Sequence, residues 1–303
     1  MSVLVSIFVL NMAKNILIKT ILLAFCLIAG FAVQLGAQEM MHRTMKHQGL
    51  EREYYLYVPE NIDPHRPLVV MLHGYGGKAA GYRPEMLETA RKHGFALCVP
   101  QGWPSPKDGK TGWNVRYPKQ EGLTTDDVAF VRKLVAKLQK EYNLSKDATF
   151  LTGMSNGGEM CYLFAWLHPE TFTSIASVAG LTMAWLPDEH RLKDAHVPFL
   201  EIHGTADHTS EWTGDPSDEF GWGAYLAVPQ AVGNIVAMNG CTYEKVEELP
   251  LKNADSHRIV LHRYLGGRDE VRLYEVQGGA HNWALDDIDT TEMIWDFFSQ
   301  SLK

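Results

Sequence analysis

The sequence contains little cysteine and no surplus of positive charge. Four cysteines occur in 303 residues, and the formal net charge is −8. Proteins that bind nucleic acid through its phosphates need a basic surface, so this charge argues against such a partner. No H-E-x-x-H motif and no paired C-x-x-C motif occurs, and His203 with His208 alone would make a poor metal site. We therefore expect neither a metal ion nor another cofactor.

Internal repeats, linkers and low-complexity stretches are also absent from the sequence. The hydrophobic fraction of 46% is sufficient for a buried core. We therefore expect one catalytic domain, from residue 38 to residue 303. The sequence does not indicate the oligomeric state.

The first 37 residues contain no acidic side chain. Basic residues precede an apolar stretch at 21–33, and small residues up to Ala37 follow it. This order predicts a secretory signal peptide at 1–37, cleavage after Ala37 and a secreted or periplasmic protein, with Met12 as the possible true start. A membrane anchor is the alternative, because the apolar stretch reaches spanning length only if residues 1–11 join it.

Removal of residues 1–37 would take away two lysines and one cysteine, so the formal net charge would become −10. The remaining cysteines, Cys98, Cys161 and Cys241, are odd in number and cannot all pair within the chain. Cys98 lies in an apolar run, and Cys161 follows a glycine-flanked serine. We expect both to be buried as small hydrophobic side chains.

Apolar runs of strand length alternate with helical patterns along the rest of the chain. We expect strands at 53–58, 67–72, 95–99, 148–153, 172–179, 197–204 and 270–276. We expect helices at 85–93, 126–142, 159–167, 228–238 and 290–302, the second of them capped by Thr124 or Thr125. This alternation predicts an α/β fold, with a mostly parallel central sheet and helices on both faces.

Four glycine-containing stretches each follow a predicted strand. They read H-G-Y-G-G at 73–77, G-M-S-N-G at 153–157, H-G-T-A-D at 203–207 and G-G-A-H at 278–281. The order serine, acid, histidine, with an H-G segment upstream, is that of α/β-hydrolases, in which the serine lies on a sharp strand-to-helix turn. The sequence therefore predicts the α/β-hydrolase fold.

The same stretches supply a candidate catalytic triad. A serine hydroxyl needs a base within hydrogen-bond reach and a third group that orients the base, and Ser155, His281 and Asp207 can fill these roles. The ester reaction also places charge on a carbonyl oxygen, for which backbone N–H groups are the usual donors. The expected donors are the amides of Tyr75 and Asn156.

Other residues compete for two of these roles. Asp286 and Asp287 are alternative acids, but Asp207 follows a strand at the carboxyl edge of the sheet, where catalytic groups gather. His203 and His208 are alternative bases. We expect His203 to hold its loop by a hydrogen bond, and His208 to be a surface residue or a substrate contact.

The chain resembles the polyhydroxybutyrate-depolymerase-like esterases, which include the feruloyl and acetylxylan esterases of carbohydrate esterase family 1. The resemblance runs from about residue 45 to the end and rests on the four glycine stretches together with D-D-V-A-F-V-R at 126–132, N-G-C at 239–241 and H-N-W at 281–283. It implies the same triad, Ser155, Asp207 and His281. Many relatives have a second cysteine before the last strand, which is missing here, so Cys241 should be a free thiol unless it pairs elsewhere. Ala280 and Ala284 also depart from the family pattern.

Aromatic side chains on the predicted active-site loops could bind the substrate. The candidates are Trp103, Trp113, Trp212, Trp222 and Trp283. With the resemblance, they favour a feruloyl esterase acting on plant cell-wall polysaccharide, ahead of an acetylxylan or other short-acyl esterase. A polyhydroxyalkanoate depolymerase comes third, because no attachment module is recognisable. A catalytically silent carbohydrate-binding relative is the non-enzyme alternative.

Overall fold

The computed structural model describes residues 40–60, 64–81, 83–190 and 196–302. The chain from Met40 onward forms one compact unit. The predicted signal peptide at 1–37 lies outside the described residues. Within the described ranges, no helix combines the length and the apolar character needed to cross a lipid bilayer.

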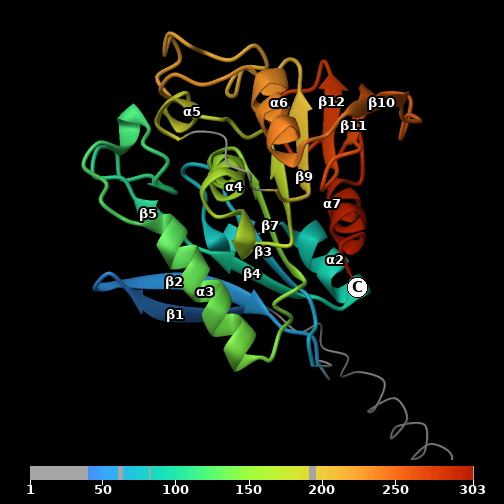
Figure 1. Cartoon of the computed structure of the whole chain (residues 1–303). Helices are drawn as coiled ribbons and strands as arrows, with labels where there is room; N and C mark the ends of the chain where they lie inside the picture. The colour runs from blue at the N-terminus through green and yellow to red at the C-terminus, as the bar shows by residue number, and fades with distance from the viewer. Residues whose placement is uncertain (1–39, 61–63, 82, 191–195, 303) are drawn as a thin grey trace, which may run out of the picture. The chain divides into compact units, whose positions relative to one another are not determined.

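A ten-stranded sheet forms the centre of this unit, with the strand order β1-β2-β4-β3-β7-β8-β9-β12-β11-β10 (Figure 1). Its strands are β1 (Met41–His47), β2 (Leu50–Tyr57), β3 (Leu68–Leu72), β4 (Ala96–Pro100), β7 (Thr149–Met154), β8 (Ser174–Val178), β9 (Phe199–Gly204), β10 (Tyr243–Glu248), β11 (Arg258–Leu265) and β12 (Val271–Gln277). All pairings from β4 across to β12 are parallel. Antiparallel strands extend both edges.

The predicted α/β sheet is therefore confirmed, but three of its edge strands were not expected. These strands are β1, β10 and β11. Every side chain of β10 is exposed, so this strand shows none of the apolar alternation by which a strand is recognised. Its partner β11 pairs it to the sheet through the backbone.

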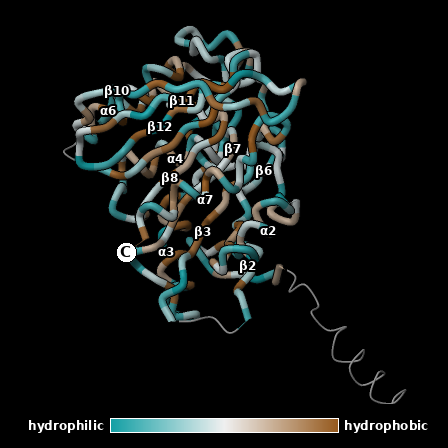
Figure 2. The backbone as a smooth tube through the Cα atoms, turned by 90° about the vertical axis from the view of Figure 1, so that its right-hand side faces the viewer, coloured by the Kyte–Doolittle hydropathy of each residue, from teal (hydrophilic) through white to brown (hydrophobic). Residues whose placement is uncertain are grey.

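Helices cover both faces of the sheet, and each face has its own apolar core. The helices α3 (Asp127–Glu141), α4 (Asn156–Leu167) and α6 (Val228–Asn239) pack on one face. On the other face lie α2 (Pro84–His93) and α7 (Thr290–Ser299). Hydrophobic stretches follow the central strands, whereas the outer loops are mostly hydrophilic (Figure 2). Short elements in the loops are β5 (Trp103–Pro104), β6 (Thr111–Gly112) and α5 (Trp185–Glu189).

The start of α3 differs by one residue from the prediction. Asp126, rather than Thr124 or Thr125, is the N-cap, because its side-chain oxygen accepts the backbone N–H of Ala129 at 2.8 Å. The hydroxyl of Thr125 instead donates to Asp127 at 3.1 Å. The cap thus lies directly before Asp127, a buried acid that bonds Arg52 of the sheet strand β2.

The parallel strands bring the four glycine stretches to one edge of the sheet. Strands β3, β7, β9 and β12 run in the same direction, and each glycine stretch begins at or just after the end of its strand. The carboxyl edge of a parallel sheet is where ligands bind in open α/β folds. The topology therefore places all candidate catalytic residues at a single edge.

Candidate active site

Ser155 lies at the tip of a sharp turn between β7 and α4. Its φ is +55° and its ψ is −123°, a region that residues with a side chain rarely adopt. Its N–H donates to the carbonyl of Val178, and its own carbonyl accepts the N–H of Glu159, both at 2.9 Å. This strained strand-to-helix turn is the position of the nucleophile in α/β-hydrolases.

The glycines on either side of Ser155 are required by close backbone contacts. A Cβ at Gly153 would lie 2.5 Å from the backbone of Gly157, and a Cβ at Gly157 would lie 2.4 Å from the carbonyl oxygen of Leu72. The turn therefore packs directly on the end of β3. A side chain at either position would push the Ser155 turn away from the sheet.

Asp207 and His281 form a hydrogen-bonded pair across the ends of β9 and β12. His281 Nδ1 lies 2.6 Å from Asp207 Oδ2, and the other carboxylate oxygen accepts the N–H groups of Thr209 and Ser210, both at 2.8 Å. Burial favours the neutral acid, but the His281 hydrogen bond and charge and the Ser210 amide hold the pKa of Asp207 below its usual value. Asp207 is therefore a buried carboxylate that orients the His281 ring.

None of the rival acids and bases replaces either member of the Asp207–His281 pair, although His203 Nε2 lies 3.6 Å from Asp207 Oδ2. Asp287 accepts both the backbone N–H and a ring nitrogen of His257, at 2.7 and 3.0 Å, and Asp286 is exposed. The side chain of His208 is 86% exposed. His203 is buried and holds its loop through the carbonyl of Ser210, as expected.

The two expected oxyanion donors have free amides. Neither the N–H of Tyr75 nor the N–H of Asn156 donates to an acceptor among the residues that the structure describes. A Cβ at Gly74 would lie 3.2 Å from Ser155 Cβ, so the Tyr75 loop adjoins the serine. No hydrogen bond joins Ser155 to His281 within the same residues. Such catalytic contacts often tighten only when substrate binds.

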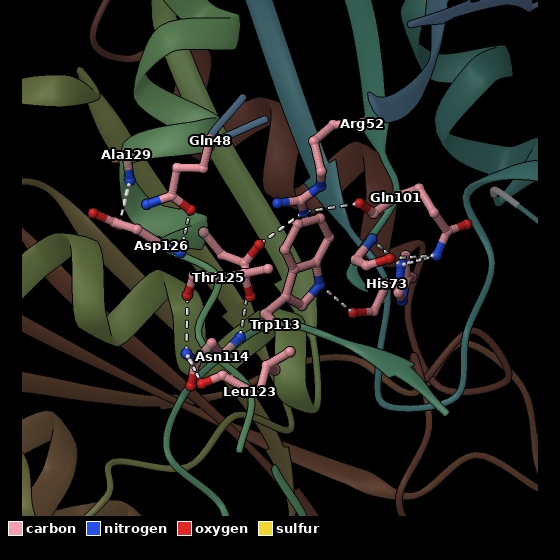
Figure 3. Close-up of polar contacts among 12 residues, drawn as sticks. Gln48, Arg52, His73, Gln101, Trp113, Asn114, Leu123, Thr125, Asp126 and Ala129 are labelled. Atoms are coloured by element: carbon pink, nitrogen blue, oxygen red, sulfur yellow. Dashed lines mark hydrogen bonds and ion pairs between the residues drawn. The ribbon is translucent and has the colours of Figure 1, made fainter. Parts of the chain in front are cut away.

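The loop at 73–77 is braced by a hydrogen-bond network that the sequence did not reveal (Figure 3). Trp113 Nε1 donates to the carbonyl of His73 at 2.8 Å. The His73 ring donates from Nδ1 to Gly74 at 2.7 Å and accepts the Gly102 N–H at Nε2 at 3.0 Å. Burial lowers the pKa of His73, which keeps the ring neutral and suits one donor and one acceptor nitrogen.

A buried ion pair supports the same region from the other side. Arg52 of β2 donates to Asp127 at 2.7 Å and to the carbonyl of Gln101 at 3.1 Å (Figure 3). Its guanidinium lies over the ring of Phe130. Asp127 also accepts the N–H of Asn114 at 2.8 Å. This network joins β2, α3 and the loop at 101–124, which carries Trp113.

A second buried network lies behind Asn156, whose amide is a candidate oxyanion donor. The Asn156 side chain pairs with both backbone groups of Trp113, at 2.6 and 3.1 Å, and donates to Glu159 at 3.2 Å. Tyr117 also donates to Glu159. Burial raises the pKa of Glu159 to about 8, although both hydrogen bonds oppose the shift.

The five candidate tryptophans differ in exposure. Trp113 is fully buried, and its side chain supports the oxyanion loop, so we no longer assign it a substrate contact. Trp103, Trp212 and Trp222 are partly exposed. Trp283 is 5% exposed and lines a cavity of about 210 Å³.

Several of these supporting residues had a weak signal in the sequence. Glu159 lies on a helix whose other side chains are almost all apolar, and Glu201 lies with His203 on the completely buried strand β9. A charged residue within a buried element is a sign of a specific polar network. His73 and Gln101 offered no such contrast. Among the described residues, no three His, Cys, Asp or Glu side chains converge to hold a metal ion.

Curated relatives of this chain are esterases at low identity. The "Bifunctional acetylxylan esterase/xylanase XynS20E" of Neocallimastix patriciarum is 24% identical over 261 residues, which cover 84% of this chain and 34% of that protein. "Probable feruloyl esterase C" of Aspergillus oryzae is 25% identical over 241 residues, or 77% of each chain. This chain thus spans about a third of the first relative and about three quarters of the second.

Solved structures share the fold. An acetyl xylan esterase from Aspergillus awamori matches with a TM-score of 0.60 and 15% identity, covering 86% of this chain and 100% of that chain. An acylaminoacyl peptidase from Pyrococcus horikoshii matches with a TM-score of 0.58 and 18% identity, covering 88% and 42%. These likenesses establish the α/β-hydrolase fold.

The family assignment rests on a match to a sequence profile. The sequence profile of the family Esterase, described as "Putative esterase", matches residues 46–221, which include the oxyanion loop, Ser155 and Asp207. The match covers more than half of the chain. With its α/β-hydrolase fold, this protein belongs to the esterase family.

Proposed function

We propose that this protein hydrolyses carboxylic esters through an acyl-enzyme, with Ser155 as nucleophile, His281 as general base and Asp207 as the residue that orients the base. The observation that carries the proposal is the 2.6 Å contact between His281 Nδ1 and the buried Asp207 carboxylate. The strained turn at Ser155 lies at the same sheet edge. No cofactor and no nucleic acid takes part.

The proposed reaction has two half-reactions. Ser155 Oγ attacks the ester carbonyl carbon while its proton moves to His281 Nε2, and the Tyr75 and Asn156 amides stabilise the oxyanion. Collapse breaks the bond to the alcohol, which receives the proton from His281. Water then attacks the acyl-enzyme with His281 as base, and the acid leaves as Ser155 is restored.

We propose a hydroxycinnamoyl ester, such as a feruloyl group on a plant cell-wall polysaccharide, as the substrate. An aromatic cluster beside the oxyanion loop supports this choice: the rings of Tyr75 and Trp222 meet edge to face with centroids 5.8 Å apart, and Tyr117 joins them. Aromatic faces of this kind suit a cinnamoyl ring or a sugar. One relative is named a feruloyl esterase.

A short-acyl ester, such as the acetyl group of acetylxylan, is the second candidate. The cavity of about 210 Å³, lined by Met154, Gly74 and Trp283 among others, is smaller than most ligand pockets. Gly74 and Met154 adjoin Ser155, so the cavity lies beside the proposed nucleophile and suits a small acyl group. Another relative is named an acetylxylan esterase.

We also propose that residues 1–37 are a signal peptide and that the enzyme is secreted or periplasmic. The proposal rests on the basic and apolar pattern of the sequence. N-terminal sequencing of the exported protein should begin at Gln38. An intact leader on membrane-bound protein would instead favour an anchor.

The test of the reaction compares methyl ferulate with acetylated xylan, using the protein from Gln38 onward and a Ser155→Ala variant as the control. Release of ferulate that the variant abolishes would support the feruloyl proposal. Release of acetate alone would move the assignment to the acetyl ester. If the folded protein cleaves neither, the acyl group is another one or the chain is a carbohydrate-binding relative.

A further inference from the structure

A second acid and imidazole pair lies directly behind the proposed triad. Glu201 and His203 are on β9, two residues apart, and both side chains are completely buried. His203 Nδ1 lies 2.9 Å from Glu201 Oε1. The reaction described above uses neither residue, yet burying two ionisable groups is costly unless they are paired.

The hydrogen-bond geometry indicates that His203 carries a positive charge. Its Nδ1 faces the Glu201 carboxylate, and its Nε2 faces the carbonyl oxygen of Ser210 at 2.8 Å. A neutral imidazole has one N–H, whereas an imidazolium donates from both nitrogens. The amide of Gly180 also donates to Glu201 Oε1, at 3.2 Å, as it would to a carboxylate. Burial would lower the pKa of His203, but Glu201, the Ser210 carbonyl and Asp207 raise it above its ordinary value.

The positive end of this pair faces Asp207. His203 Nε2 lies 3.6 Å from Asp207 Oδ2, the same oxygen that bonds His281. The carboxylate is therefore shared between two imidazole rings. A charge on His203 stabilises ionised Asp207 and weakens the hold of Asp207 on a protonated His281.

We propose that Glu201 and His203 are positioning residues that keep Asp207 ionised and thereby set the acidic limb of the pH profile of the enzyme. The inference rests on the proposed triad, because it assigns the pair a role through Asp207. Glu201 balances the charge of His203, so the pair acts as a buried dipole with its positive end towards the catalytic carboxylate. It also fixes the Ser210 segment, whose amide bonds Asp207.

Few other charges face His203 from the elements packed around it. Helix α6, which covers β9 and β12, contains no charged residue. Glu275 is its register partner on β12, and its carboxylate lies 3.4 Å from His262. Tyr162 and Cys161 of α4 lie near Glu201. In the loop after β9, the Trp212 ring contacts the His203 ring edge to face, and Glu211 precedes Trp212 in the sequence. Glu201 and Asp207 are thus the charges closest to His203 among the described residues.

The test measures kcat/KM against pH for the wild-type enzyme and for His203→Gln. Glutamine keeps a donor for the Ser210 carbonyl but carries no charge. The acidic limb should move to higher pH by about 0.5 to 1 unit, as expected when a partly compensated charge several ångströms away is lost. The double variant Glu201→Gln with His203→Gln should shift it in the same direction. His208→Gln, the exposed neighbour of Asp207, is the matched control and should not move it.

An acidic limb unchanged in both His203→Gln and the double variant, with only a uniform loss of rate, would reduce the pair to a structural role. A second measurement covers variants that do not fold: nitrogen and proton NMR of the unsubstituted protein, at the pH of the acidic limb, should show two ring N–H protons on His203, and a single one would overturn the proposal. The Ser155→Ala variant separates failure of the proposed esterase reaction from failure of the proposed role of Glu201 and His203. If that variant keeps activity, the proposed function fails, whereas the NMR result does not depend on catalysis.

Discussion

Ser155 is held in a backbone conformation that would be unfavourable on its own. Conformations of this kind cost about 1–3 kcal/mol and persist only where the surroundings enforce them. Here the backbone bonds to Val178 and Glu159 enforce it. One strained position of the backbone is therefore the residue that the proposed reaction needs at the tip of a turn.

The Asp207→Asn variant tests the orienting role of this carboxylate. An asparagine can still accept the amides of Thr209 and Ser210, so the fold should persist, but its amide group cannot hold His281 in the tautomer that accepts a proton from serine. Turnover should fall about 10⁴-fold, as in other triads with this change. Steady-state kinetics with thermal unfolding as the control measure both effects. Near wild-type turnover would assign the acid to another residue.

The buried Glu159 makes the stability of the protein depend on pH. Its pKa is raised from 4.5 to about 8 in the folded state, so between these values the unfolded chain loses a proton that the folded protein keeps. Stability from this group therefore falls as pH rises through that window, by an amount on the order of a few kcal/mol.

Glu159→Gln removes this dependence and keeps an acceptor for Tyr117 and Asn156. Relative to wild type, the variant should gain free energy of unfolding between pH 5 and pH 9. Urea unfolding of both proteins at pH 5, 7 and 9 measures the gain. Two parallel pH curves would show that the group does not titrate as described.

The junction of β7, α4 and β3 depends on backbone contact. Gly157→Ala would put a Cβ 2.4 Å from the carbonyl of Leu72, and neither element can move without displacing the Ser155 turn. The substitution should lower the free energy of unfolding by about 3 kcal/mol or more, the upper range for overpacking. Activity should fall with it.

Gly233→Ala on α6 is the matched control for this prediction. Gly233 is an exposed helical glycine, and a Cβ there meets nothing within 4 Å. The alanine should raise stability by about 0.5–1 kcal/mol, because glycine is the weaker helix former. Chemical unfolding of both variants gives the comparison. Equal effects would mean that backbone contact does not explain Gly157.

Two separate apolar cores stabilise the unit that begins at Met40. The sheet separates one apolar core under α3, α4 and α6 from a second under α2 and α7.

Cys98 and Cys161 are buried free thiols, and Cys241 is a partly buried one, which agrees with the expected absence of its family partner. Burial raises the pKa of all three, so they are weakly reactive.

Stability should therefore not depend on a disulfide in the protein from Gln38 onward. A reducing agent should leave its midpoint of thermal unfolding unchanged, whereas loss of a native disulfide typically costs about 2–5 kcal/mol. Differential scanning calorimetry with and without dithiothreitol measures this. A clear drop in the midpoint would reveal a pairing that involves Cys241.

Local sequence patterns were sufficient for much of the fold and for the candidate triad. The central strands are buried and mostly apolar, because a parallel sheet covered by helices is buried on both faces, and each of these strands leads into a glycine stretch with a distinctive residue. The edge strand β10 escaped prediction because pairing of its backbone with β11, and not burial of its side chains, holds it in the sheet. Trp113 was assigned to the substrate because it lies on a predicted active-site loop, but its side chain is completely buried.

The sequence by itself determined the α/β class, the order of the glycine stretches and the chemical identity of the candidate catalytic groups, because these follow from residue type and short-range spacing. Only the tertiary structure decided which histidine meets Asp207, which tryptophans are buried and where Glu159 and Glu201 are paired. Those choices depend on contacts between segments far apart in the chain. Such contacts exist only once the parallel strands bring their carboxyl ends to one edge of the sheet.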